Sequence, residues 1–387
     1  MSLITQIKAH VFNVSIKTNW VFISVKTDDG SIGWGEASLN GWEPALKLFT
    51  QQTELRMLGM RLDDAIASLK VWANSPGGLV LNTVTSAVAQ ALLDLQAQTK
   101  GQTLHGALSS LKRPHVPLYA NVNRATTRRT PEGFVATASR ALMQGFNSFK
   151  VAPFDGVTPD NCHTPDGQAK VNHGVACMRA LRTTLGSGVR LMVDCHWRFD
   201  EACALDVLRQ LEDVHLYWYE CPIAENHANW PAYRRIRTVA NAQGVLLAAA
   251  ESQVGLASFQ TLIEEALFDV IMPDIKYCGG PWEMLAIARY AHESGVLFSP
   301  HNPSGPIASQ YSLAVAAVAP ECGMLELQYD ESAYFDELVF DQNPVMVQGS
   351  FPVQAEQQAA LKPNLALIQS RPYKPVPPGV ETILNGL

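Results

Sequence analysis

The period of the hydrophobic positions changes along the chain, and each change marks a different kind of element. Near the N-terminus, apolar and polar residues alternate in short stretches, which predicts a three-stranded meander over Ile4–Ser15, Trp20–Thr27 and Ser31–Ala37. The Asp28-Asp29-Gly30 turn joins the last two strands, since Asp-Gly favours a tight hairpin. From Glu43 to about Gly106 the pattern becomes helical, most clearly over Thr83–Lys100. Residues 1–115 are therefore predicted to form an α+β domain.

Strand candidates and helical segments alternate after Pro114 and Pro117, up to about residue 328. Eight strands are predicted, at Val116–Val122, Ser148–Ala152, Arg190–Asp194, Leu216–Glu220, Val245–Glu251, Asp269–Asp274, Val296–His301 and Met324–Gln328. Eight parallel strands close a (β/α) barrel, so we predict an α/β fold with a barrel over residues 116–328 and the N-terminal domain as its cap. Residues 329–387 lack this alternation and are expected to pack back on the capping domain and complete it.

The longest break in the alternation is Pro153–His173, which follows the second barrel strand directly. This segment is rich in Pro, Gly and Asp, and its position places it at the mouth of the barrel. It is therefore either a lid over that mouth or a plain surface insertion, and the pattern favours neither.

Composition narrows the classes of function. The 387 residues carry a formal net charge of −7, which argues against a nucleic-acid-binding surface. No uninterrupted apolar run approaches the roughly 20 residues of a membrane helix. The seven cysteines show no CxxC or disulfide spacing, which is typical of a reducing compartment, and no signal-peptide pattern is visible. A cytoplasmic protein without nucleic-acid or membrane partners is expected.

Three consecutive barrel strands end in a carboxylate: Asp194, Glu220 and Glu251. The carboxyl ends of barrel strands converge on one mouth, so these side chains should meet there. Oxygen ligands suit Mg²⁺ better than zinc. Each acid alone could equally be a helix N-cap or an ion-pair partner. Three in register repel one another unless a cation or protons compensate them, and we therefore predict a metal site.

The next two strands end in Asp274 and His301. Adjacent strand ends lie within side-chain reach, so Asp274 can orient His301 and raise its basicity, as in a catalytic dyad. A lone histidine between prolines is more often structural, but the pairing beside a candidate metal site favours a base.

Three further side chains are predicted at the mouth. His196 shares a strand face with Asp194. It could be a fourth metal ligand, a proton donor or a group that hydrogen-bonds substrate, and we favour the proton donor because oxygen ligands already suffice for Mg²⁺. Lys150, at the end of the second strand, either holds a substrate carboxylate, which we favour, or neutralises a ligand acid. Glu326, at the eighth strand end, either binds substrate or caps the following segment.

This ordered set resembles the enolase superfamily, mandelate racemase subgroup, over almost the whole chain. The motifs Ile32-Gly-Trp-Gly-Glu36 and Ala91-Leu-Leu-Asp94 support the resemblance. It implies an enolase-like modified TIM barrel and one Mg²⁺ that stabilises an enediolate after a base removes the proton α to a carboxylate. Carried over residue by residue, Asp194, Glu220 and Glu251 match the metal ligands, Asp274 and His301 the base dyad, and Lys150 the first lysine of a Lys-x-Lys motif.

The chain departs from that pattern at Ala152, where the second lysine is missing, which argues against racemisation through opposed bases. Instead, Asp194-Cys-His196-Trp-Arg198 resembles the Asp-x-His-x-Arg pattern of acid-sugar dehydratases of the galactonate type, whose histidine protonates the leaving hydroxide. Arg198 would bind substrate or form a structural ion pair. The resemblance also places specificity in the capping loops, where Trp20 and Trp42 either enclose a substrate or pack on the barrel rim.

The expected function is therefore a Mg²⁺-dependent dehydratase of a monocarboxylate or dicarboxylate sugar acid, giving a 2-keto-3-deoxy acid. His301 is the expected base and His196 the expected acid. The alternatives are a cycloisomerase or epimerase working through the same enolate and, from a different class, a non-catalytic barrel that binds sugar acids. The expected partner is a small-molecule carboxylate, and the chain is expected to form a homo-oligomer.

Overall fold

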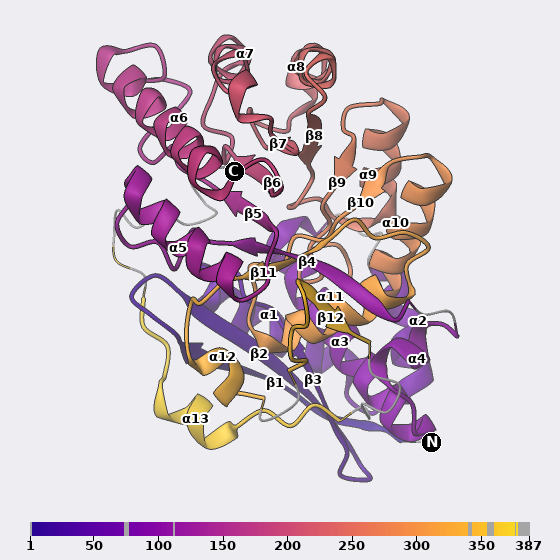
Figure 1. The fold of residues 1–387 in the computed structure, drawn as a ribbon. Coiled ribbons are helices and arrows are strands. Elements are labelled where there is room, and N and C mark those ends of the chain that lie inside the picture. Colours follow the sequence, from indigo (N-terminus) through magenta and orange to yellow (C-terminus); the bar gives the residue numbers. More distant parts are fainter. Residues whose placement is uncertain are drawn as a thin grey trace.

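The computed structural model describes residues 2–72, 77–110, 113–339, 343–353, 360–375 and 377. It has an N-terminal α+β domain beneath a ring of parallel strands and helices (Figure 1). The N-terminal meander consists of β1 (Ile4–Asn13), β2 (Asn19–Thr27) and β3 (Ile32–Glu36), paired antiparallel in that order. Four helices follow it, α1 (Glu43–Met57), α2 (Leu62–Trp72), α3 (Gly78–Lys100) and α4 (Leu104–Leu108).

Helix α3 packs directly on β3 because two glycines leave room for it. A Cβ on Gly35 would lie 1.9 Å from the Ala87 carbonyl oxygen, and one on Gly33 would lie 2.1 Å from that of Ala91. Such distances are sterically forbidden, so the Gly-x-Gly spacing of the strand is what allows close contact with the helix. Asp94 of α3 then accepts a hydrogen bond from the Trp34 backbone N–H at 3.2 Å.

Helix α3 is also the one helix among the described residues that is long and apolar enough to cross a membrane. Its apolar window is 78% buried inside the protein, against the meander and the neighbouring helices. The core of the capping domain therefore accounts for its hydrophobicity.

Eight parallel strands form the second part of the fold. They lie in the order β10-β9-β8-β7-β6-β5-β4-β11. Their bounds are β4 (His115–Asn121), β5 (Ser148–Val151), β6 (Arg190–Asp194), β7 (Trp218–Glu220), β8 (Leu246–Ala249), β9 (Val270–Ile271), β10 (Leu297–Phe298) and β11 (Leu325–Gln328). Backbone hydrogen bonds from Gly323 to Phe298 (2.8 Å) and from Glu326 to Pro300 (3.3 Å) join the two edges. The predicted barrel is thus confirmed, with strands at all eight predicted places.

Helices surround the barrel, as the alternation predicts. They are α5 (Pro131–Met143), α6 (Pro165–Leu185), α7 (Glu201–Gln210), α8 (Trp230–Ala242), α9 (Gly255–Glu264), α10 (Pro281–Glu293) and α11 (Pro306–Val318), with 3-10 turns η1 (Glu212–Val214) and η2 (His227–Asn229). Side chains of Thr130, Thr164 and Asp200 cap α5, α6 and α7 by accepting a backbone N–H three residues on. Tyr119, Met192, Trp218 and others fill the barrel interior.

The C-terminal segment contacts both parts of the molecule. It contains α12 (Tyr334–Glu337), β12 (Ser350–Pro352) and α13 (Leu365–Ser370). β12 pairs antiparallel with the first half of β4, whereas Arg371 donates from Nε to the carbonyl of Asn13 at 2.8 Å. α12 and α13, in orange and yellow in Figure 1, lie beside the meander. The segment therefore packs against the capping domain and also extends the barrel sheet at the N-terminal end of β4.

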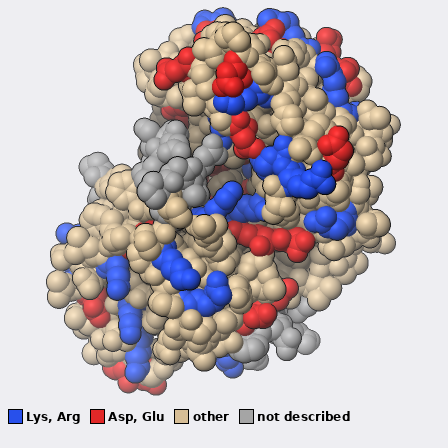
Figure 2. Space-filling view, turned by 90° about the vertical axis from the view of Figure 1, so that its left-hand side faces the viewer, with Lys and Arg blue, Asp and Glu red and all other residues tan. Residues whose placement is uncertain are grey.

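Basic and acidic side chains are interspersed on the face drawn in Figure 2. Neither sign forms a continuous patch among the residues coloured there. On this face, therefore, neither sign of charge dominates.

Candidate active site at the mouth of the barrel

The inner face of the barrel carries the predicted acids to its mouth. Side chains alternate between the two faces of a strand, and Met192 and Trp218 point into the interior. Two residues further on, Asp194 and Glu220 lie on the same inner face, where they are direct partners in the β6–β7 register. The period of two therefore places both carboxylates side by side above an apolar floor.

The backbone turns sharply where these strands end. His196, Cys221 and Ala250 adopt left-handed conformations, with φ of 48°, 44° and 78°. Non-glycine residues rarely occupy this region, and where they do they cluster at functional sites. At β6, β7 and β8 alike, the strained residue lies next to or near a predicted metal ligand. We interpret the strain as the cost of pointing these acids into one mouth.

Asp194 and Glu220 approach one another closely enough to share a cation. Each offers an oxygen that lies within 4.8 Å of the other and of the Cys221 Sγ atom. The Cys221 thiol is a poor ligand here, because burial raises its pKa well above the usual value and it stays neutral, donating to Glu225 Oε1 at 3.4 Å. The hard oxygen pair remains as the core of a candidate metal centre.

Glu251 is the third acid, and its surroundings also fit a cation. Burial raises the pKa of Glu251 to about 8, and the charge of Asp194 adds to the effect. Its buried Oε2 atom has no hydrogen-bond partner among the described residues. That atom lies 3.3 Å from His301 Nε2, a contact too poorly aligned for a hydrogen bond. Among the described residues, Glu251 does not belong to the group of Asp194, Glu220 and Cys221 atoms that lie within 4.8 Å of one another. A divalent cation would still satisfy its Oε2 atom and relieve the repulsion, and carboxylate oxygens are the ligands that Mg²⁺ prefers.

Lys150 lies beneath these acids and is fully buried. Its Nζ atom is 2.7 Å from Glu220 Oε1 and 3.1 Å from Glu326 Oε1. Of the two roles weighed for Lys150, these contacts match the neutralisation of a ligand acid and not the favoured one, the binding of a substrate carboxylate.

Glu326 is held at both carboxylate oxygens. Asn121 donates to Oε1 at 2.6 Å, and the backbone N–H of Asn302 donates to Oε2 at 2.9 Å. The carboxylate thus ties β11 to β4 and to the segment after β10. It anchors the ring of strand ends in addition to pairing with Lys150.

The predicted dyad is present in the structure. Asp274 and His301 are partners in an isolated parallel bridge just beyond the ends of β9 and β10, which brings their side chains together. His301 Nδ1 lies 2.8 Å from Asp274 Oδ2. With the Nδ1 proton donated to the carboxylate, the Nε2 lone pair faces the acid cluster and can accept a proton.

Lys276 joins this dyad, although the sequence reasoning did not select it. Its Nζ atom lies 2.8 Å from Asp274 Oδ2, and its backbone N–H donates to Asp274 Oδ1 at 2.7 Å. Asp274 Oδ2 is therefore shared by the Lys276 ammonium and His301 Nδ1, whereas Oδ1 accepts the Lys276 backbone N–H. The sequence contained a sign of this role, because Lys276 follows Asp274 by two residues, the same spacing that drew attention to His196 after Asp194.

His196 lies beside the first predicted ligand, but the predicted shared strand face is wrong, because β6 ends at Asp194 and His196 stands in the turn that follows. Its Nε2 atom is 2.9 Å from Asp194 Oδ2, and its backbone N–H donates to Asp194 Oδ1 at 2.9 Å. Burial opposes the charge of His196, but Asp194 outweighs burial, and the pKa of His196 is raised. Arg198 follows and donates to the carbonyl of Val157 at 3.3 Å. Its guanidinium thus contacts the segment after β5.

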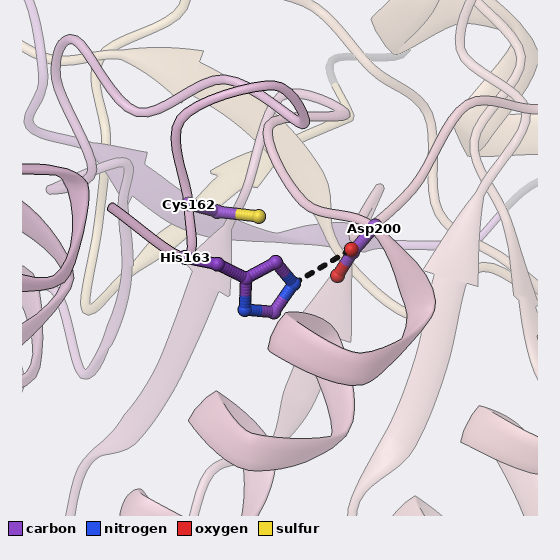
Figure 3. Close-up of side chains that lie close together, drawn as sticks. All are labelled: Cys162, His163 and Asp200. Carbon is purple, nitrogen blue, oxygen red and sulfur yellow. Dashed lines mark hydrogen bonds and ion pairs between the residues drawn. The ribbon is translucent and has the colours of Figure 1, made fainter.

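That segment is braced against the start of α7. Cys162, His163 and Asp200 face one another across two loops (Figure 3). His163 Nε2 lies 2.7 Å from Asp200 Oδ2, while Asp200 Oδ1 accepts the Cys203 N–H at the N-cap of α7. Protein partners already engage these groups, so we interpret them as a clamp. The clamp and the Arg198 contact hold residues 157–163 against the loop that carries His196.

The two tryptophans of the capping domain lie in different environments. Trp20 is 1% exposed and stacks on Phe12 with ring centroids 6.1 Å apart. It offers no surface to a substrate, so the packing alternative holds for Trp20. Trp42 is partly buried at the start of α1 and packs against the apolar core of the capping domain. Its contact with a substrate stays a prediction.

A polar trio that the sequence reasoning missed spans the mouth from the cap to the barrel. Arg124, shortly after β4, donates from Nη1 to Glu331 Oε2 at 2.7 Å. Thr18, in the loop between β1 and β2, donates to Glu331 Oε1 at 3.2 Å. Their separation of roughly 100 to 300 residues left no local signal.

Comparisons with known proteins agree with this arrangement. The family model Enolase C-terminal domain-like matches residues 133–357, and the model Mandelate racemase / muconate lactonizing enzyme, N-terminal domain, matches residues 5–108. A D-galactonate dehydratase of Pectobacterium atrosepticum is 24% identical over 343 residues, covering 86% of this chain and 85% of the relative. A D-gluconate dehydratase of Thermoproteus tenax is 27% identical over 319 residues, covering 80% of this chain and 61% of the relative.

The fold also matches solved structures. A crystal structure of an enolase from Agrobacterium radiobacter with bound Na and L-malate has a TM-score of 0.81 at 22% identity. The match covers 96% of this chain and 95% of that one. Both the capping domain and the barrel therefore have counterparts in a known fold.

Proposed function

Because the chain belongs to the enolase superfamily, in its mandelate racemase subgroup, we propose that it is a Mg²⁺-dependent dehydratase of a sugar acid. The relatives named D-galactonate and D-gluconate dehydratase support the choice of substrate class. The observation that carries the proposal is the placement of two histidines at one acidic mouth. Asp194, Glu220 and Glu251 are the proposed ligands.

The two histidines follow strands on opposite sides of the ring. His301 follows β10 and His196 follows β6, and these strands lie four places apart in a barrel of eight. A sugar acid lying between them presents its α-carbon to one imidazole and its β-hydroxyl to the other. This arrangement suits a base and an acid acting on neighbouring carbons.

The proposed reaction divides into a proton abstraction and an elimination. His301 Nε2 accepts the proton from the α-carbon, with Asp274 fixing the tautomer at 2.8 Å from Nδ1. The electron pair of that C–H bond is first delocalised into the carboxylate, which gives an enediolate. That pair then forms the carbon–carbon double bond as the β-hydroxyl leaves, and His196 donates a proton so that the hydroxyl leaves as water. The enol product tautomerises to a 2-keto-3-deoxy acid. Mg²⁺, when bound, supplies positive charge that stabilises the developing enediolate.

Lys150 supports this chemistry from below. Because its ammonium compensates Glu220 and Glu326, the acid cluster can assemble before a cation arrives. The apolar floor of Met192 and Trp218 keeps bulk water from the underside of the cluster.

The direct test is a screen of sugar acids with purified protein and Mg²⁺, in which 2-keto acids are detected with semicarbazide. His301→Asn should abolish both keto-acid formation and α-proton exchange in D₂O. His196→Asn should stop dehydration and leave the exchange measurable. Loss of both reactions in His196→Asn would reverse the assigned roles, and exchange without any keto acid in the native protein would favour an epimerase.

A further inference from the structure

The trio of Thr18, Arg124 and Glu331 lies across the mouth from the proposed metal ligands. Those ligands follow β6, β7 and β8, whereas Arg124 and Glu331 follow β4 and β11, neighbouring strands on the other side of the ring. The capping loop meets them there through Thr18. A sugar acid whose carboxylate lies at the acid cluster therefore extends its far end toward this trio.

Arg124 belongs to the mouth and not to the outer surface. Its side chain is 33% exposed, yet its charge interacts with the buried residues Glu326 and Tyr277. Glu331, which it pairs with, is only 9% exposed at its side chain. Arg124 is therefore a partly exposed cation next to buried groups, so its guanidinium remains accessible to a ligand at the mouth.

Among the described residues, the basic side chains near the mouth already have acidic or carbonyl partners, so little positive charge remains to attract a second carboxylate. Lys150 forms ion pairs with Glu220 and Glu326. Lys276 forms an ion pair with Asp274, and Arg124 forms one with Glu331. Arg198 is engaged with the segment after β5. A carboxylate placed against Arg124 would also lie beside the Glu331 carboxylate, and like charges so close disfavour binding by about tenfold or more.

A hydroxyl group suits the same pair well. Guanidinium N–H groups donate to its oxygen, and a carboxylate accepts its hydrogen, so a neutral polyol tail satisfies both members of the Arg124–Glu331 pair. Thr18, which is only 5% exposed, holds Glu331 in place from the capping loop. The pair therefore recognises alcohol groups without demanding a net charge.

We infer that the site takes monocarboxylate sugar acids, whose terminal hydroxyls bind the Arg124–Glu331 pair, in preference to the corresponding dicarboxylates. The inference rests on the proposed function, which places the substrate carboxylate at the acid cluster. It narrows the substrate to acids with a single carboxylate.

The test uses pairs of acids that differ only at the terminal carbon, such as galactonate with galactarate and gluconate with glucarate. Dissociation constants are measured by calorimetry with the Mg²⁺-loaded protein, and keto-acid formation is measured in parallel. For the pair that binds tightest, the monocarboxylate should bind at least about tenfold more tightly than its dicarboxylate. Glu331→Gln keeps the side-chain shape and should narrow that ratio several-fold, because Arg124 then becomes free to take a carboxylate. Glu337→Gln, at an exposed acid in α12, is the matched control and should leave the ratio unchanged.

The outcomes separate this inference from the proposed function. Equal or tighter binding of the dicarboxylate, or a ratio that Glu331→Gln does not alter, overturns the inference even if keto acids form. A monocarboxylate preference without any keto acid supports the inference and refutes the dehydratase. Failure of all four acids to bind refutes both.

Discussion

Replacing Lys150 by methionine tests how far the acid cluster depends on its buried ammonium. The substitution keeps an unbranched chain and removes the charge from a side chain that is 1% exposed. Two carboxylates then lose a cation that lies 2.7 Å and 3.1 Å away. At an effective dielectric constant of about 20, these ion pairs correspond to roughly 6 and 5 kcal/mol of Coulomb attraction, respectively.

The net effect is smaller, since burying the ammonium also costs solvation free energy. Removal of one partner from a buried ion pair typically destabilises a protein by about 3–5 kcal/mol, and we expect Lys150→Met to fall in that range. The loss should depend on pH. Glu220 and Glu326 without Lys150 have pKa values raised above those of the unfolded chain, so the folded variant binds more protons. Its stability is then best at low pH and decreases as pH rises through those raised pKa values.

Urea unfolding followed by circular dichroism at pH 7.5, in the absence of divalent cations, measures the change. Lys170→Met is the control, because Lys170 pairs with Asp166 at 2.6 Å on the surface, with side chains 39% and 73% exposed. Such a pair contributes about 0.5 kcal/mol. Adding Glu326→Gln to Lys150→Met should recover part of the loss. If Lys150→Met is no more destabilising than Lys170→Met, the ammonium does not stabilise the cluster and the reasoning is refuted.

Three further predictions concern the metal site, pH and packing. Asp194→Asn should weaken Mg²⁺ binding by about tenfold or more in calorimetry, and unchanged affinity would contradict its role as a ligand. Burial, with a smaller effect of Lys8, lowers the pKa of His10 from 6.5 to about 4. His10 therefore binds a proton below about pH 6.5 in the unfolded chain but only below about pH 4 in the folded one. His10 should therefore remove about 2 kcal/mol of stability between pH 7.5 and pH 5, and His10→Gln should lack that part of the pH dependence. Gly35→Ala should destabilise by at least about 3 kcal/mol, because its Cβ would overlap the α3 backbone, whereas Gly188→Ala has open space and should be neutral in the same unfolding assay.

The spacing of apolar residues along the chain determined which segments form strands and helices and which side chains share a face of each strand. Alternation with a period of two put Asp194 and Glu220 on the inner face of their strands, and the structure has them as direct register partners. Eight strand candidates predicted a closed barrel, and parallel strands have their carboxyl ends on one side, so the position of the acids at the mouth followed. These features are local: each depends on residues a few positions apart.

Contacts between distant segments were decided only by the tertiary structure. Lys150 could hold substrate or neutralise an acid, and the choice depends on Glu220 and Glu326 closing around it from other strands. The burial of Trp20 depends on how the cap sits on the barrel, and the Arg124–Glu331 pair forms because β4 and β11 become neighbours only when the ring closes. No periodicity encodes such pairs, since their partners are brought together by packing and not by spacing along the chain. Local pattern therefore determines which groups arrive at the mouth, and the closed barrel determines which of them pair with one another and which are left to meet a ligand.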